Sequence, residues 1–122
     1  MKLPADFQKI IAKEFYDTHI FVRGQKPVKD SLGAVSMVPD ALIWEGKGNC
    51  IPSEKQLMEE IFGNWIQGSY YLSAPLEAGL EEGMLVKTDN VKEWLKISGI
   101  VKRLSHYECQ CGVLDITEYS GG

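Results

Sequence analysis

The chain has 122 residues, the length of one ordinary domain, and its 44% hydrophobic and 25% charged residues exclude disorder throughout. Thirteen basic and seventeen acidic residues give a net charge of −4, which disfavours a primary role in nucleic-acid binding. No apolar run approaches the roughly 20 residues that span a bilayer, and the N-terminus lacks the continuous apolar segment of a signal peptide. We therefore expect no membrane association and a protein that stays where it is made.

The first predicted element is an amphipathic helix at residues 1–18. Pro4 suits a first helical turn, and Asp6 suits the positive end of the helix dipole. Apolar side chains then recur at steps of three and four residues and form one stripe, which must be buried somewhere. This stripe is the candidate docking surface of the helix, and it consists of Phe7, Ile10, Ile11 and Phe15.

A strand is predicted at residues 20–22, where aromatic and β-branched residues follow the helix. Residues 23–39 are predicted to form a long loop, because Gly24, Pro27 and Gly33 interrupt a stretch with few apolar residues. One short strand fits within this loop, around residues 34–38. A further strand is predicted at residues 41–44, and the glycine-rich turn at 45–49 ends it.

The segment 52–64 is predicted to lie between two barrel strands. Ser53 and Gln56 have the spacing of a capping box, and Leu57, Met58 and Ile61 repeat with helical period, which favours a short helix. The alternative is an extended, mobile loop that becomes ordered only against a partner. A strand rich in aromatic residues is then predicted from Trp65 to residue 74.

The rest of the chain is predicted to form short strands and tight turns. An acidic turn at residues 79–83 precedes strands at 85–86, 94–101 and 107–116. Short strands at this spacing are typical of a small antiparallel barrel or sandwich. The predicted fold is therefore mainly β: a single domain over 1–122, with a small antiparallel β-barrel at 19–118.

Three cysteines, Cys50, Cys109 and Cys111, form a poor disulfide framework, so reduced thiols are expected. With His106 they would supply four zinc ligands. In a strand, however, His106 would face away from Cys109, which makes small buried thiols the better interpretation. Neither nucleophile nor phosphate-binding motifs occur, so we expect no enzyme activity, no cofactor and no metal.

The aromatic and acidic clusters of the sequence are explained better by structural roles than by binding or catalysis. Tyr70 and Tyr71 beside Trp65 could stack on bases, but no lysine or arginine lies between Glu60 and Leu85, so packing in a core or subunit interface explains them better. The acidic pairs at 59–60 and 81–82 are typical of a solvated face.

The second half of the chain, residues 44–116, resembles the small head–tail joining proteins of tailed bacteriophages and prophages, the head-completion or stopper proteins. The similarity follows the order of strands and turns. It comprises Ile43-Trp44-Glu45-Gly46, the polar segment 53–64, Ser69-Tyr70-Tyr71-Leu72-Ser73-Ala74-Pro75, residues 80–87, Trp94-Leu95-Lys96-Ile97-Ser98-Gly99-Ile100, and His106-Tyr107-Glu108 leading into the final strand.

This resemblance implies a β-barrel connector that is made in the bacterial host cytoplasm and built into the virion at the head–tail interface. It would form a homo-oligomeric ring between the portal or adaptor above and a tail terminator or tail protein below. Double-stranded DNA would pass through transiently. The segment 52–63 would project into the channel and hold DNA back, and its candidate residues are Ser53, Glu54, Lys55, Gln56, Glu59 and Glu60.

Two alternatives remain open at this point. One is a tail terminator or other tail component with a related fold. The other is a cellular binding module with an SH3-like or OB-like barrel that recognises a peptide or single-stranded nucleic acid. A fold alone does not separate these functions.

Overall fold

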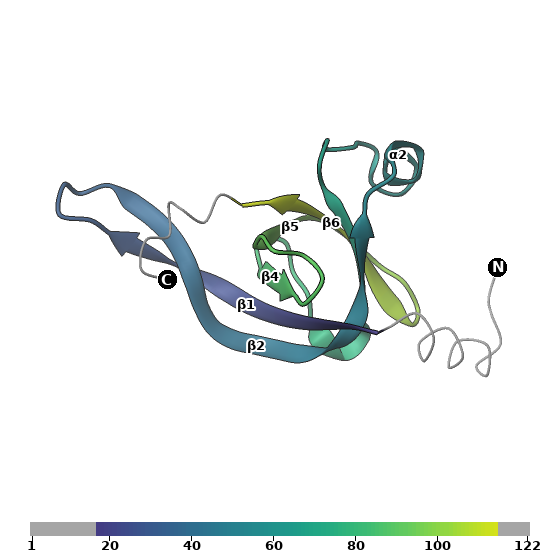
Figure 1. Ribbon diagram of the computed structural model, residues 1–122, viewed down its shortest axis with the longest axis horizontal. Helices are drawn as coiled ribbons and strands as arrows, with labels where there is room; N and C mark the ends of the chain where they lie inside the picture. The colour runs from purple at the N-terminus through teal and green to yellow at the C-terminus, as the bar shows by residue number, and fades with distance from the viewer. Residues whose placement is uncertain (1–16, 115–122) are drawn as a thin grey trace.

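A computed structural model describes residues 17–114 (Figure 1). Within this part of the chain the structure has six strands, one α-helix and one short 3-10 helix. In chain order these are β1 (Thr18–Lys29), β2 (Val35–Pro52), α2 (Lys55–Phe62), β3 (Tyr70–Pro75), η1 (Leu76–Ala78), β4 (Leu85–Thr88), β5 (Leu95–Lys102) and β6 (His106–Val113).

The six strands form one closed barrel in the order β1-β2-β3-β6-β5-β4, and every pair is antiparallel. The pairing of β1 with β4, in addition to its pairing with β2, closes the ring. Val22 accordingly lies opposite Trp44 of β2 and opposite Val86 of β4. Closure leaves the barrel itself without an unpaired edge. The prediction of a mainly β, small antiparallel barrel is confirmed.

The barrel interior is filled by the inward-facing side chains of all six strands. In β6, Tyr107, Cys109 and Cys111 belong to the core, as expected for every second residue of a strand, while Gln110 on the opposite face is buried as well. The core cluster consists of Ile20, Val22, Cys50, Leu72, Ala74, Ala78, Leu80, Val86, Val91, Leu95, Ile97, Tyr107, Cys109 and Cys111.

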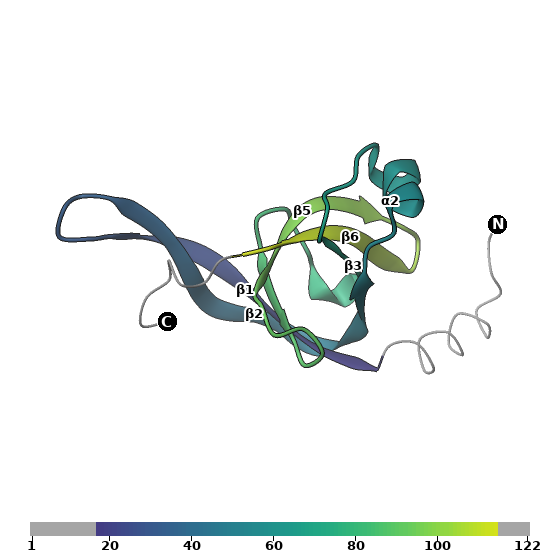
Figure 2. The same ribbon diagram turned by 45° about the horizontal axis from the view of Figure 1, so that its top comes forward.

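The predicted long loop at residues 23–39 is wrong. β1 continues to Lys29 and β2 begins at Val35, so the two strands form a long hairpin that extends beyond the barrel (Figure 2). The register shifts between Val22 and Arg23 and between Arg23 and Gln25 absorb the irregular residues as bulges. Gly24 and Pro27 therefore lie within β1, and Gly33 lies in the turn of the hairpin. The short strand expected around residues 34–38 falls within β2.

The segment 52–64 does contain a helix, as its periodicity favoured. Its N-cap is Glu54, which makes no side-chain capping bond, so the predicted capping box of Ser53 and Gln56 is not formed. The hydroxyl of Ser53 instead lies 2.8 Å from the Ser69 hydroxyl and accepts a hydrogen bond from Nε1 of Trp65 at 3.0 Å. The strand predicted from Trp65 begins only at Tyr70.

Two predicted features fall on residues that the structure does not describe. The N-terminal helix at 1–18, with Phe7, Ile10, Ile11 and Phe15, lies almost entirely outside the described residues, and so does the end of the last predicted strand beyond 114. Among residues 17–114, no helix has the length and apolar character needed to cross a membrane.

Candidate functional site

The most prominent surface feature is the part of the β1–β2 hairpin that leaves the barrel, residues 23–42, which we call the arm. Beyond Arg23, β1 pairs with no described strand other than β2, because its pairing with β4 ends at the Arg23–Leu85 pair. β2 reaches β3 only from Asn49 onward. Among residues 17–114, the arm is therefore a two-stranded ribbon with no third strand beside it, and Figures 1 and 2 show it projecting far from the barrel.

Both faces of the arm carry apolar side chains. Opposite residues of an antiparallel pair lie on the same face, and successive pairs alternate between faces. The pair Val28 and Ser36 therefore lies on one face, and the pair Lys29 and Val35 lies on the other. Val28 is 44% exposed and Val35 is 63% exposed, so apolar surface is open to solvent on both faces.

The outer edges of the arm are unsuited to strand addition. Pro27 pairs with Met37, and Pro39 pairs with Gln25, so each strand of the arm contains one proline. A proline has no N–H, and natural proteins use it to protect edge strands from pairing with other chains. A partner of the arm should therefore contact its side chains rather than extend its sheet.

The turn at the tip of the arm is closed by hydrogen bonds and carries an exposed leucine. The Asp30 carboxylate accepts hydrogen bonds from the backbone N–H groups of Leu32 and Ala34, both at 2.9 Å. Gly33 has a φ of 86°, a conformation that favours glycine. Leu32 is 92% exposed at this turn, and the backbone that carries it loses little further conformational freedom on binding.

The six predicted channel residues lie on or next to α2. Glu54, Lys55, Gln56, Glu59 and Glu60 are all exposed, whereas Ser53 is half-buried by its bonds to Ser69 and Trp65. The structure thus gathers these residues on one short segment outside the barrel wall. They are presented by a helix and not by an extended loop.

Two side chains fix α2 against the barrel. Met58 is fully buried beneath the helix. At its C-terminal end, the Phe62 ring lies so close to Gly99 of β5 that an added Cβ would approach it to 3.2 Å. Gly99 therefore allows the helix to lie directly on β5.

A pocket of about 340 Å³ opens between α2 and β5. We call it the α2 pocket. Its lining is mixed. The apolar side chains are those of Ile61, Phe62, Ile66, Ile100 and Val101, and the polar side chains are those of Asn64, Glu82, Ser98 and Gln110.

One wall of the α2 pocket is held by the buried side chain of Gln110. Its Oε1 accepts the backbone N–H of Ile66 at 3.1 Å, and its Nε2 donates to Oδ1 of Asn64 at 3.0 Å. These bonds tie the segment after α2 to β6. Because Gln110 is only 2% exposed, water cannot replace them without cost.

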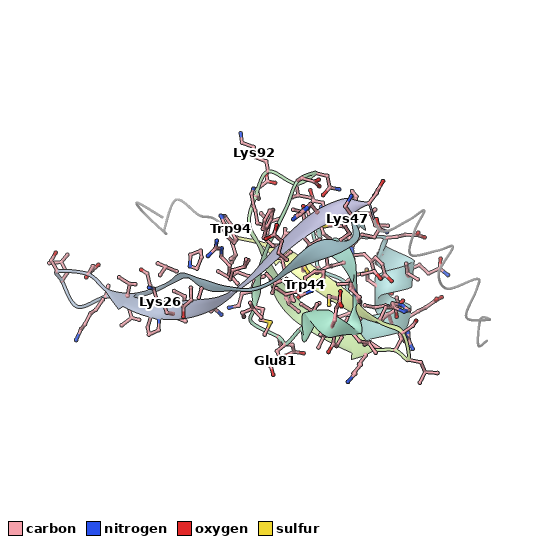
Figure 3. All side chains as sticks on the ribbon, turned by 90° about the horizontal axis from the view of Figure 1, so that it is seen from below. Lys26, Trp44, Lys47, Glu81, Lys92 and Trp94 are labelled. Atoms are coloured by element: carbon pink, nitrogen blue, oxygen red, sulfur yellow. The ribbon has the colours of Figure 1, made fainter. Side chains whose placement is uncertain are left out.

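Charge is unevenly distributed over the surface. Residues 56–86 contain five acidic side chains and no lysine or arginine, and these lie on α2 and around η1. β1 carries Arg23, Lys26 and Lys29 and no acidic residue. In Figure 3, Lys26 lies on the arm, away from the barrel, and Glu81 lies at the barrel.

Tyr70, Tyr71 and Trp65, the aromatic residues that could stack on bases, make contacts within the chain. Tyr70 packs against the core cluster, and the Tyr71 hydroxyl donates to Oε1 of Glu108 at 2.8 Å. Trp65 donates to the Ser53 hydroxyl. These contacts agree with a packing role.

The three cysteines are free thiols inside the barrel. Burial raises the pKa of Cys50 to about 11 and that of Cys109 to about 12, and burial likewise raises the pKa of Cys111. Such thiols are protonated at neutral pH and are poor nucleophiles. Within residues 17–114, no group of three histidine, cysteine, aspartate or glutamate side chains is placed to hold a metal ion.

We expect the buried thiols to make the fold sensitive to alkaline pH. Above the ordinary thiol pKa of 9.0, the unfolded chain loses protons that the native chain keeps up to about pH 11 at Cys50. The free energy of unfolding should therefore fall as pH rises through this window, by up to about 1.4 kcal/mol per pH unit for each thiol.

Urea unfolding at pH 8, 9, 10 and 11 measures this dependence. Cys50→Ala is the comparison variant, since it should lower stability at pH 8 but flatten the pH profile. Equal slopes in the two proteins would contradict the predicted role of Cys50.

Comparisons with known proteins support the fold alone. No family model matches the chain, and no curated protein matches it. Among solved structures, it is similar to the solution structure of protein SF1141 from Shigella flexneri 2a, a structural genomics target, with a TM-score of 0.61 and 10% sequence identity. The match covers 81% of this chain and 93% of that chain.

Sequence reasoning missed the arm and the α2 pocket. A signal for the arm was present, because Asp30 and Gly33 form a turn between the β-branched residues Val28 and Val35. The α2 pocket had no comparable signal, since its lining comes from α2, β5, β6 and two separate turns.

Proposed function

We propose that this protein is a structural component of a virion, a head–tail connector of the stopper or completion type. It would form a homo-oligomeric ring below the portal and help to retain DNA. The observation that supports this proposal most strongly is the arm. A two-stranded ribbon is marginally stable in water, and this one exposes apolar side chains on both faces. An element of this kind is suited to contact with neighbouring subunits.

The resemblance of the strand and turn order in residues 44–116 to head–tail joining proteins supports the same proposal. In such a ring, the exposed side chains of α2 would face the DNA channel, with Glu54, Glu59 and Glu60 as the acidic groups. An acidic lining would let DNA pass without gripping its phosphates. The presence of a helix in this segment favours narrowing of the channel over closure by an extended loop.

The proposed partners are the portal or adaptor protein above the ring and a tail terminator or tail protein below it. The stripe formed by Phe7, Ile10, Ile11 and Phe15 is the proposed docking surface for one of these neighbours. Function would depend on assembly and shape, without catalysis. Synthesis would take place in the bacterial host cytoplasm, and the finished protein would be located in the virion.

Light scattering and electron microscopy test the proposal. Purified protein, alone and mixed with the portal protein encoded in the same genome, should form rings that bind the portal. Preferential binding to tail tube ends would favour a tail terminator. A protein that stays monomeric in both conditions and binds oligonucleotides or peptides would contradict the connector function and favour a cellular binding module.

A further inference from the structure

We infer that the tip of the arm of one copy docks in the α2 pocket of the next copy, with the side chain of Leu32 inserted. This inference rests on the proposed ring assembly and names the contact that builds it. The occupant of the α2 pocket is thus a second copy of this chain, joined head to tail.

The tip of the arm offers an apolar side chain of a size that the α2 pocket can hold. Leu32 is 92% exposed on a turn that Asp30 holds in place. The α2 pocket, at about 340 Å³, has room for one aliphatic side chain and offers Ile61 and Ile66 as apolar contacts. Burial of one leucine in such a site is typical of an interface anchor.

The two surfaces are also complementary in charge. Lys29 lies three residues from Leu32 on the same hairpin, and Glu82 lines the α2 pocket. Lys26 adds a second positive charge on the arm. With Asp30 and Asp40 counted, the arm still has one more basic than acidic residue. The Glu82 carboxylate therefore favours contact of the pocket with an arm over contact between two arms.

The position of the surfaces favours a ring. The arm and α2 lie towards opposite ends of the molecule in both Figure 1 and Figure 2. One copy therefore cannot insert its own tip, and a pair of copies with one such contact keeps a free tip and a free pocket. Repetition of a head-to-tail contact gives a closed ring where the rotation between copies closes.

Substitution of Leu32 tests the contact. We expect Leu32→Asp to weaken self-association by about thirty-fold or more, the effect of losing one interface hot spot, as measured by light scattering over a concentration series. Leu104→Asp is the matched control, because Leu104 is 82% exposed at the β5–β6 turn. It should leave the ring unchanged. Matching thermal unfolding curves of the variants would show that the fold is intact.

A charge exchange tests the partner surface. Lys29→Glu and Glu82→Lys should each weaken association by about two- to five-fold, as for an exposed ion pair, and the double variant should recover it. A mixing experiment tests the direction of the contact. Leu32→Asp keeps its pocket and Ile66→Lys keeps its tip, so each should be monomeric alone and their mixture should form a dimer.

The outcomes separate this inference from the proposed function. Rings that persist in Leu32→Asp, or that Leu104→Asp disrupts equally, would overturn the arm contact and leave the connector proposal standing. A mixture that stays monomeric would overturn the head-to-tail arrangement. Wild-type protein that is monomeric at every concentration, with and without the portal, would overturn both.

Discussion

Replacement of Gly48 by alanine is expected to lower the free energy of unfolding by about 3 kcal/mol, at the upper end for an overpacked core. Gly48 is buried in β2, next to Asn49, which pairs with Ser73 of β3. An added Cβ would lie 2.4 Å from the backbone oxygen of Ser73 and 2.5 Å from Cδ1 of Ile20. A closed barrel cannot open at this point without loss of strand pairing, so the methyl group has no space.

Urea denaturation monitored by circular dichroism measures this effect. Gly112→Ala is the control, because Gly112 also lies in a strand, β6, but has no atom within 4 Å of an added Cβ. Its stability should be unchanged or raised by about 0.5 kcal/mol, since alanine reduces the entropy of the unfolded chain. Gly46→Ala should be intermediate, because its Cβ would meet the movable Trp44 side chain. Equal stability of the Gly48 and Gly112 variants would refute the steric argument.

Met58→Ala is expected to release α2 from the barrel and to cost about 2–5 kcal/mol in local or global stability, as for other buried long side chains. Met58 is the one fully buried residue of the helix, whose eight residues are too few to be stable alone. Hydrogen exchange of the amides in residues 55–63 measures the release directly. The exposed surface of α2, with the proposed channel residues, depends on this anchor.

The neighbouring residue supplies the control for this second experiment. Leu57 is 38% exposed, so Leu57→Ala should change stability by no more than about 0.5–1 kcal/mol and leave the amide protection of α2 in place. If both variants lost the same protection, α2 would not be held by Met58. Contacts other than that of Met58 would then hold α2 beside β5 and form the α2 pocket.

The sequence predicted the helix α2 as an element but did not predict the contacts that its first residues make with the rest of the fold. Helical periodicity in residues 55–62 indicated α2, and the structure confirms it. The capping interpretation failed because the Ser53 hydroxyl bonds to Ser69 and Trp65, which are distant in sequence but adjacent in the fold. Local chemistry identified a polar side chain at the helix start without specifying its partner.

The arm shows why glycine and proline are ambiguous signals. Pro27 and Pro39 are compatible with strands here because, within the part of the chain that the structure describes, the arm has no third strand to which they would need to donate. In a central strand, the same residues would break the ladder. The prediction of a loop at residues 23–39 failed because the number of neighbours of a strand is not encoded within that strand.

From the sequence alone, alternation and turn residues determined the β class, and the spacing of apolar residues determined the helix. Only the tertiary structure decided that β3 pairs with β6, that the barrel closes through β1 and β4, and that a pocket opens beside α2. The physical reason is the distance along the chain over which each effect acts. Backbone preferences and side-chain periodicity act over a few neighbouring residues, whereas strand order and cavities depend on which distant side chains fill the same core.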